Sequence, residues 1–258
     1  MTKYLDWLQS ALGGALGFSS FRNMSVAQVI RERLPATLQL MSLAFVTSLI
    51  AGIALGTWQG FRSGTKAERV SSTITMTVFS IPEFWLAIIL LWVFALNMHW
   101  FPTQGMNDVT GHTSTFAAFA DRLHHIILPW LSLALIDMAV ISRYQRAAMR
   151  EVLNQQFLRT ARAKGVPEQE IMWWHALRVA ILPTITIAGL FFPALFVGAV
   201  LIERVFGWPG IGSELTSAIE SRDYLLVSGI VIVGSAMTAL GSFLADTARE
   251  LADPRLRA

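Results

Sequence analysis

The sequence contains no cysteine. This absence excludes a disulfide framework, a thiolate zinc site and a cysteine nucleophile. Charge is also scarce, because Asp, Glu, Lys and Arg make up only 14% of the 258 residues, whereas a soluble domain carries about 25%. The formal net charge is only +3, and the basic residues lie between apolar runs. That distribution argues against a nucleic-acid-binding protein, which would carry a clustered basic face.

Sequence motifs for ATP binding and hydrolysis are also missing. No G-x-x-x-x-G-K-[ST] loop is present, and "SGTKAE" at Ser63 to Glu68 lacks its Gly-Lys-Ser/Thr core. Neither H-E-x-x-H nor G-x-S-x-G occurs, so no nucleophile–base motif supports an intramembrane enzyme. We therefore expect the chain to be no enzyme, and to hold no cofactor of its own.

Hydrophobic residues make up 54% of the chain, and they gather in five long runs. A membrane span needs roughly 20 apolar residues, and lipid offers the backbone no hydrogen-bond partner, so each span should be helical. The sequence therefore predicts an all-α integral membrane protein with about five transmembrane helices. The predicted spans are residues 36–58, 71–96 (interrupted by Pro82 and Glu83), 126–141 (short, with Asp137 inside), 179–202 and 225–245.

Lysine and arginine are unevenly distributed between the two sets of connecting segments. One set holds 13 of the 20 basic residues and the other holds 7, and the richer set should be cytoplasmic. Residues 1–35 are then an external N-terminal segment, and residues 36–258 form a transmembrane domain with a cytoplasmic loop at about 143–178. The N-terminal tail should lie outside and the C-terminus in the cytoplasm.

The longest predicted cytoplasmic loop includes "RTARAKGVPEQEIMWWHALRVAILP", from Arg159 to Pro183. Gly165 can end a short helix because glycine tolerates a left-handed backbone. Pro167 suits the first turn of a second helix, and Glu168 suits its positive N-terminal end. The sequence predicts a short helix, a sharp turn and a second helix that leads into the fourth span.

This segment resembles the cytoplasmic loop of ABC transporter permeases of the dipeptide, oligopeptide and nickel importer family. Five further segments, in the same order, are similar to motifs of that family. They are "ERLPATLQL", "SIPEFWLAIILLWVFAL", "HHIILPWLSLAL", "ERVFGWPGIGSEL" and "LADPRLR". The family usually begins with one further span and an external segment. Here "YLDWLQSALGGALGFSS" is similar to the end of that external segment, so we expect the first span of the family pattern to be missing.

The resemblance implies a type I importer permease that forms half of a translocation path for peptides or a similar small solute. It implies a second permease subunit, two ABC ATPase subunits that bind ATP and magnesium, and an extracytoplasmic solute-binding protein, all in a bacterial inner membrane. Surrounding lipid is the remaining partner, and no nucleic acid is expected. The loop then supplies the ATPase-coupling residues, which are Thr160, Ala161, Arg162, Ala163, Lys164 and Gly165.

Several other residues are candidates for the translocation path or its external gate. Asp137 is an ionisable residue inside a span, and such residues usually face a cavity or pair with another helix; Arg143 is the nearest candidate partner. Pro82 interrupts a span, as is tolerated where the break lines a cavity or protein, and Phe84 and Trp85 follow it. We expect Phe206, Trp208 and Pro209 to form an external gate, a contact for the binding protein, or a structural cap.

Two questions remain open at this point, and a metal site is a third possibility that we do not expect. The chain could be a secondary carrier that uses Asp137 as a proton site. Gly52, Gly56 and Gly60 could support close helix packing within the chain or against a second permease. The outer histidines (His99, His112, His124 and His125) show no fixed ligand spacing, so we do not expect a metal site there. The sequence does not identify the substrate.

Overall fold

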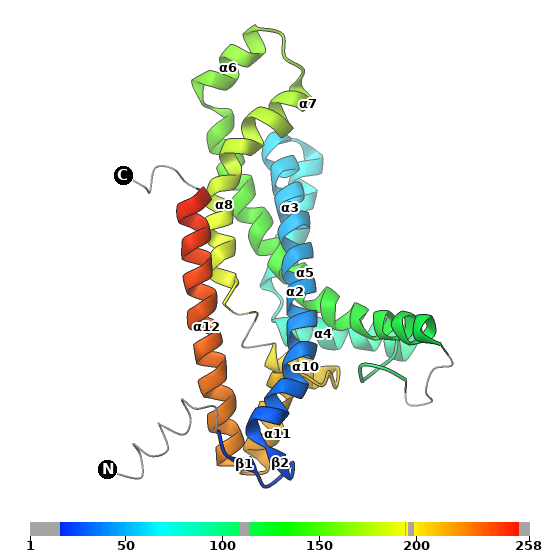
Figure 1. Ribbon diagram of the computed structural model, residues 1–258. Helices are drawn as coiled ribbons and strands as arrows, with labels where there is room; N and C mark the ends of the chain where they lie inside the picture. The colour runs from blue at the N-terminus through cyan, green and yellow to red at the C-terminus, as the bar shows by residue number, and fades with distance from the viewer. Residues whose placement is uncertain (1–15, 109–113, 194, 196–198, 253–258) are drawn as a thin grey trace. The chain divides into compact units, whose positions relative to one another are not determined.

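The computed structural model describes residues 16–108, 114–193, 195 and 199–252 (Figure 1). Within these residues the only strands are β1 (Phe18–Ser19) and β2 (Met24–Ser25), an antiparallel pair with Phe18 opposite Ser25. All other regular elements are helical. They are α2 (Val26–Phe61), α3 (Lys66–Ser80), α4 (Glu83–Leu90), η1 (Leu91–Asn97), α5 (Thr115–Leu153), α6 (Gln156–Ala163), α7 (Glu168–Glu170), η2 (Ile171–Ala176), α8 (Leu177–Phe191), α10 (Val200–Val205), α11 (Ile211–Glu220) and α12 (Tyr224–Ala252).

The helices confirm the all-α membrane fold predicted from the apolar runs. Four helical stretches are long and apolar enough to span a membrane, and a fifth span results if the bent pair Lys66–Ser80 and Glu83–Asn97 counts as one. The axis turns by 102° at this break, because Pro82 cannot donate a backbone hydrogen bond and restricts Ile81 to an extended conformation, as observed (φ −83°, ψ 129°). The predicted second span is therefore broken where proline interrupts it.

Two helix lengths differ from the sequence-based prediction. The third span was predicted as a short segment, but α5 is 39 residues long because its charged ends continue the same helix beyond the apolar part. Similarly, α2 begins at Val26, so Pro35 lies inside a helix of 36 residues, and residues 26–35 of the predicted external N-terminal segment form the first part of that helix. The fourth predicted span is covered by α8 and α10, with residues 194 and 196–198 outside the described part.

The chain divides into two compact units, one formed by residues 1–42, 87–130 and 193–241, and the other by residues 43–86, 131–192 and 242–258. We call them the first and second unit. In the second unit, α2 packs closely on α5. A Cβ atom added at Gly52 would lie 2.7 Å from Ile141 Cβ, and one at Gly60 would lie 2.6 Å from Met149 Cβ. The glycine repeat therefore serves packing within the chain.

A buried glutamine joins three helices of the second unit. Gln145 of α5 is fully buried. Its amide donates to Thr57 Oγ1 of α2 at 3.1 Å, and its carbonyl accepts from Thr184 Oγ1 of α8 at 2.6 Å. Because a buried polar group must be paired to avoid a large desolvation cost, this chain of hydrogen bonds fixes the rotation of the three helices about their axes.

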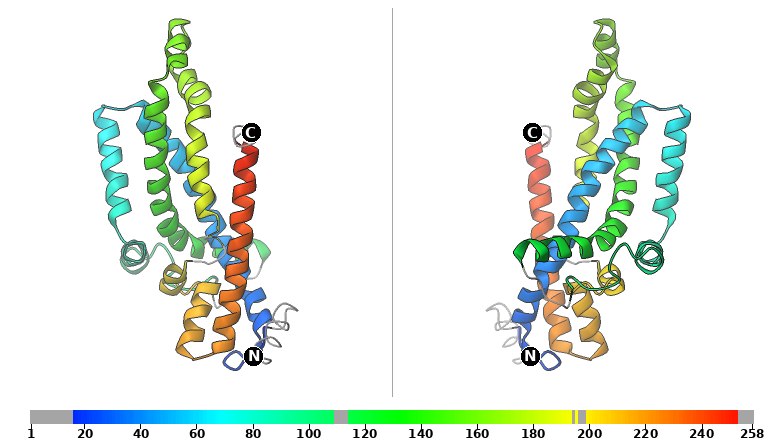
Figure 2. Two further views of the ribbon diagram at one scale, coloured as in Figure 1. Left: turned by 90° about the vertical axis from the view of Figure 1, so that its left-hand side faces the viewer. Right: turned by 90° about the vertical axis from the view of Figure 1, so that its right-hand side faces the viewer.

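The first unit has its own apolar core. Val26, Val29 and Ile30 of α2 pack against Ile211 and Ala218 of α11, and Leu226 and Ile230 of α12 complete the cluster. Figure 2 shows α11 beside the first part of α12. The start of α2 is therefore packed against the segment that follows the fourth predicted span. This segment includes most of "ERVFGWPGIGSEL" (Glu203 to Leu215), which we call the external motif after its predicted side of the membrane.

Candidate coupling segment, path residues and external motif

The predicted coupling segment forms a helical hairpin in the second unit, drawn at the top of Figure 1. Helix α6 ends at Ala163, and Gly165 follows with φ +78°, a left-handed conformation that suits glycine. The backbone N–H of Gly165 donates to Arg162 O at 2.9 Å, which closes the turn. The chain then enters α7 after Pro167. This confirms the predicted sequence of helix, turn and helix.

The hairpin is built on an apolar core of its own. Leu158 and Ala161, three residues apart on α6, are buried in a cluster with Met149 and Val152 of α5 and Ile171 of η2. The methyl group of Ala161 therefore faces this core, where it sets a close distance between α6 and its neighbours. The turn is therefore stabilised both by the packing of α6 on this core and by the left-handed conformation of Gly165.

Exposed residues of α6 and the turn present a mixed surface. Thr160, Arg162, Ala163, Lys164 and Gly165 are all exposed. The Arg162 guanidinium pairs with the Glu168 carboxylate at 2.9 Å across the turn, an exposed ion pair that orients the side chain more than it stabilises the fold. The role of these residues in ATPase coupling stays a prediction, and the geometry leaves five of the six predicted residues accessible to a partner.

A buried carboxylate ties the start of α3 to α5. Glu68 is almost fully buried, and Arg146 and Arg150 of α5 form ion pairs with it, the latter at 3.5 Å. Thr65 caps α3 by accepting a hydrogen bond from Glu68 N at 3.2 Å. Breaking a buried ion pair leaves an uncompensated charge, so this arrangement fixes the α2–α3 connection to α5.

The candidate path residues lie near the break between α3 and α4. Phe84 and Trp85 have 38% and 55% of their surface exposed, so in this chain neither is a core residue. Asp137 of α5 is partly buried and close enough to Glu83 for their charges to interact. The Arg143 guanidinium instead lies 5.8 Å from the ring centre of Phe79. Within the described residues no ion pair joins Asp137 to Arg143.

In the first unit, the external motif folds as a helix (α10), a turn and a second helix (α11). Trp208, in the turn between α10 and α11, is fully buried and donates from Nε1 to Ala36 O at 2.9 Å. Phe206 is also buried, and Pro209 is partly exposed. Both aromatic side chains therefore pack inside the unit. A role of the three residues as a gate or binding-protein contact stays a prediction.

A second buried carboxylate organises this turn. Glu203 accepts from Thr37 Oγ1 at 2.7 Å and from Ser213 N at 2.9 Å, and Thr37 Oγ1 accepts from Ile211 N at 2.8 Å. The carboxylate thus caps the N-terminus of α11, where a negative charge is favourable. Burial raises the pKa of Glu203 above its usual range, although these hydrogen bonds oppose the shift.

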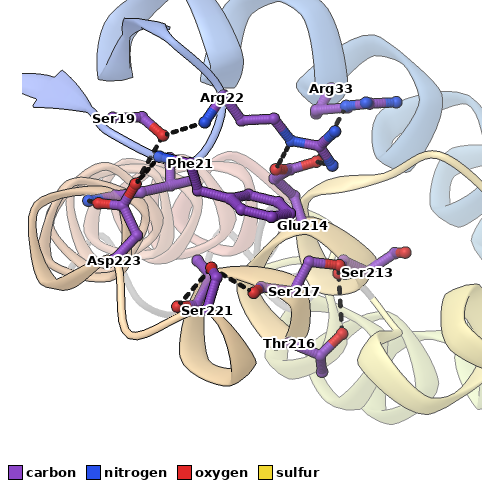
Figure 3. A network of polar contacts seen from close by, with 12 residues as sticks. Ser19, Phe21, Arg22, Arg33, Ser213, Glu214, Thr216, Ser217, Ser221 and Asp223 are labelled. Atoms are coloured by element: carbon purple, nitrogen blue, oxygen red, sulfur yellow. Dashed lines mark hydrogen bonds and ion pairs between the residues drawn. The ribbon is translucent and has the colours of Figure 1, made fainter.

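Arginines from the N-terminal segment also bind this motif (Figure 3). Glu214 of α11 is buried and accepts from Arg22 Nε at 2.6 Å and from Arg22 Nη2 at 2.7 Å, a bidentate pair. Arg33 Nε lies 3.1 Å from the same carboxylate. Such forked pairs are the stronger kind of ion pair, so residues 16–33 are anchored to α11 by charge as well as by apolar packing.

Asp223 makes a related link beside this network (Figure 3). Its carboxylate accepts from Ser19 Oγ at 2.7 Å, from Phe21 N at 3.2 Å and from Leu226 N at 3.1 Å. Burial opposes the charged form, but these hydrogen bonds together outweigh it and hold the pKa of Asp223 below its usual range. The residue therefore stays ionised while it joins the β1–β2 turn to the start of α12.

The described histidines are engaged locally. His124 Nε2 lies 2.7 Å from Trp100 O, and His125 Nδ1 lies 2.9 Å from Asp121 O. His99 adopts φ +57°, and its Nδ1 atom lies 3.2 Å from Asn97 O.

His112 is outside the described residues. The same is true of "LADPRLR" from Asp253 onward and of the part of the chain before Leu16. In the described part of the chain, no three His, Asp or Glu side chains gather in a way that could hold a metal ion.

Sequence reasoning did not identify Thr37, Glu203 or Glu214 as structural residues. Thr37 and Glu203 are 166 positions apart, and no local pattern predicts their pairing. The one available signal was an acidic residue, Glu203, at the end of a long apolar run. A buried charge requires partners, but the sequence does not show which residues supply them.

Comparisons with known proteins agree with these features. The family model described as "Binding-protein-dependent transport system inner membrane component" matches residues 48–258. The oligopeptide transport system permease protein AppB of Bacillus subtilis (strain 168) is 38% identical over 255 residues, which cover 98% of this chain and 79% of that protein. The oligopeptide transport system permease protein OppB of Mycobacterium tuberculosis (strain ATCC 25618 / H37Rv) is 35% identical over 263 residues, covering 100% of this chain and 80% of that protein.

Two solved structures share the fold at low sequence identity. One shows inward-facing conformations of the MetNI methionine ABC transporter, with a TM-score of 0.66 and 14% identity, covering 88% of this chain and 97% of that chain. The other is an amino acid ABC transporter with histidines, with a TM-score of 0.63 and 16% identity, covering 86% of this chain and 94% of that chain. At these identities the likeness concerns the fold alone, which is that of an ABC importer permease.

Proposed function

This chain belongs to the family of binding-protein-dependent transport system inner membrane components, and from this membership we infer that it is the permease subunit of an ATP-driven importer for oligopeptides. The curated relatives named above are oligopeptide permeases that match nearly the whole chain. In this proposal the chain forms half of the translocation path. A second permease, two ATPases and an extracytoplasmic binding protein complete the importer.

The observation that carries the proposal is the hairpin from α6 through Gly165 to α7. It has an apolar core and an exposed tip, and η2 joins it to α8 without a break. On the other side, a turn at Asn154 and Gln155 separates α6 from α5. A push on the tip is therefore transmitted directly along α8, and through the packed core of the hairpin to α5. Such a rigid lever fits a transporter that alternates between two states while energy enters from outside the chain.

We further propose that the complex resides in a bacterial inner membrane, with the hairpin and the C-terminus in the cytoplasm and residues 16–33 outside. The distribution of basic residues supports this orientation. ATP and magnesium are assigned to the ATPase subunits, since the chain contains no phosphate-binding loop.

The test is transport by the reconstituted complex. The chain is co-expressed with its candidate permease and ATPase partners, placed in proteoliposomes with the binding protein, and supplied with a labelled pentapeptide. We expect uptake that requires ATP and that is lost when the ATPases are inactivated. Uptake that survives ATP depletion but collapses with an uncoupler, and that Asp137→Asn abolishes, would instead establish the secondary carrier.

A further inference from the structure

A small cavity in the second unit combines two arginines with polar and aromatic walls. It lies at α3 and α5, with α2 on one side, and its volume is about 100 Å³. Neither the coupling hairpin nor the external motif contributes to it. Its lining includes Gln59 of α2, Ser72, Thr75 and Phe79 of α3, and Arg143 and Arg146 of α5.

The cavity carries an excess of positive charge. Arg146 is matched by the Glu68 carboxylate and also donates to Ser72 Oγ. Arg143 has the Phe79 ring beneath it at 5.8 Å, and within the described residues no carboxylate pairs with it. An aromatic face stabilises a guanidinium only modestly. The charge of Arg143 therefore remains available to a ligand.

The second arginine is already engaged. Arg146 pairs with Glu68 and donates to Ser72 Oγ, and its Nε atom is covered by protein. Arg146 therefore adds positive charge beside the cavity without offering a contact of its own. The free charge of Arg143 favours an oxyanion as the ligand.

The surface of α3 beside the cavity is mixed. Six of the 15 residues of α3 are serine or threonine, and exposed hydroxyls such as those of Thr73 and Thr77 donate to carbonyls of their own helix. Ile74 and Met76 of the same helix are exposed as well. A face that combines hydroxyls with apolar side chains suits a peptide, whose backbone is polar and whose side chains vary.

We propose that this cavity binds the terminal carboxylate of the transported peptide, with Arg143 as its main contact. This inference rests on the proposed function, since a peptide delivered to an oligopeptide importer carries such a group. Phe79, Met76 and Ala139 supply an apolar wall against which the last side chain of the peptide packs. The cavity is open and Arg143 is exposed, so binding is weak enough for the solute to leave, as transport requires.

The experiment compares two peptides that differ only at this group. ATP-dependent uptake of a pentapeptide with a free carboxylate is measured against uptake of the same peptide with a C-terminal amide, in proteoliposomes of the complete complex. We expect Arg143→Gln to lower the ratio of free-acid to amide uptake roughly fivefold relative to wild type, the size expected for one partly exposed charge-assisted contact. Because the binding protein is the same in both complexes, its own preference cancels.

Arg69→Gln is the matched control, because it removes an exposed arginine of α3 that does not line the cavity; it should leave the ratio unchanged. Thr75→Asp gives a second route should Arg143→Gln fail to assemble, since it places a competing carboxylate in the cavity and should also lower the ratio. An unchanged ratio in both variants, with uptake intact, overturns the cavity assignment and leaves the peptide importer standing.

Two other outcomes are equally informative. If native mass spectrometry finds phosphatidylglycerol bound to wild type and lost in Arg143→Gln, while both peptides are affected equally, the occupant is a lipid headgroup phosphate and the proposal is overturned. If the wild-type complex imports neither peptide with ATP, the proposed function fails and the cavity assignment falls with it.

Discussion

Gly210 illustrates how a single missing side chain allows the external motif to fold. A Cβ atom at this position would lie 2.3 Å from the Glu203 carboxyl carbon. The Glu203 carboxylate cannot retreat easily, because Thr37 and Ser213 hold it from two sides. Glycine is needed at residue 210 because there is no room for a side chain. The backbone conformation does not require it, since any residue could adopt φ −97°.

Gly210→Ala should therefore destabilise the first unit by about 1–3 kcal/mol through overpacking. Gly234→Ala is the matched control, because an added Cβ there meets nothing within 4 Å and the residue lies inside α12; alanine in a helix is neutral or favourable. Thermal unfolding of the purified complex, followed by fluorescence-detected gel filtration, compares the two. Equal unfolding temperatures for Gly210→Ala and wild type would show that the carboxylate moves freely.

At the same scale, charge pairing was the least predictable feature. Asp137 was expected to pair with Arg143 or to face a cavity, and in the structure Arg143 lies over Phe79 instead. Glu68, which the sequence analysis named only as the last residue of "SGTKAE", is a buried partner of two arginines. Pairings of this kind depend on side chains that tertiary packing brings together, and local sequence does not encode them.

Among the elements, those with a strong local cause were predicted well. The break in the second span follows from Pro82, and the turn of the coupling segment follows from Gly165, so both could be predicted from a few neighbouring residues. Helix ends were predicted less well. Charged residues marked the end of an apolar run at each side of α5, but the helix continues through them because charge ends a membrane span and does not end a helix.

The coupling hairpin allows a prediction about the turn itself. Gly165 has φ +78° and its N–H donates to Arg162 O. Gly165→Pro should abolish ATP-coupled uptake, because proline fixes φ near −65° and removes this donor. Gly165→Asn should keep most of the activity, since asparagine tolerates the left-handed conformation better than other residues.

The measurements are peptide uptake and ATPase stimulation in the reconstituted complex. A Cβ atom added at residue 165 would have no neighbouring atom within 4 Å. A difference between the two variants therefore reports backbone conformation and not crowding. Normal transport by Gly165→Pro would show that the turn has no part in coupling.

For the whole molecule, the distribution of basic residues is the main argument for orientation. The predicted cytoplasmic segments hold six more lysines and arginines than the external ones. Among the described residues, ion pairs engage three arginines on each side: Arg22, Arg33 and Arg204 on the external side, and Arg146, Arg150 and Arg162 on the cytoplasmic side. Because the ion pairs involve equal numbers of arginines on the two sides, the excess of unpaired lysines and arginines on the predicted cytoplasmic side stays the same. The positive-inside rule also counts basic residues and not net charge.

The absence of cysteine makes this orientation directly testable, because any introduced thiol is the only one in the chain. Lys164→Cys places a thiol at the exposed tip of the hairpin, and Ser221→Cys places one in the exposed turn before α12. A membrane-impermeant maleimide should label Ser221→Cys in intact spheroplasts and Lys164→Cys only after permeabilisation. The opposite pattern would invert the proposed topology and remove the hairpin from reach of a cytoplasmic ATPase. That result would also contradict the coupling role, since a lever on the outer face cannot receive energy from ATP.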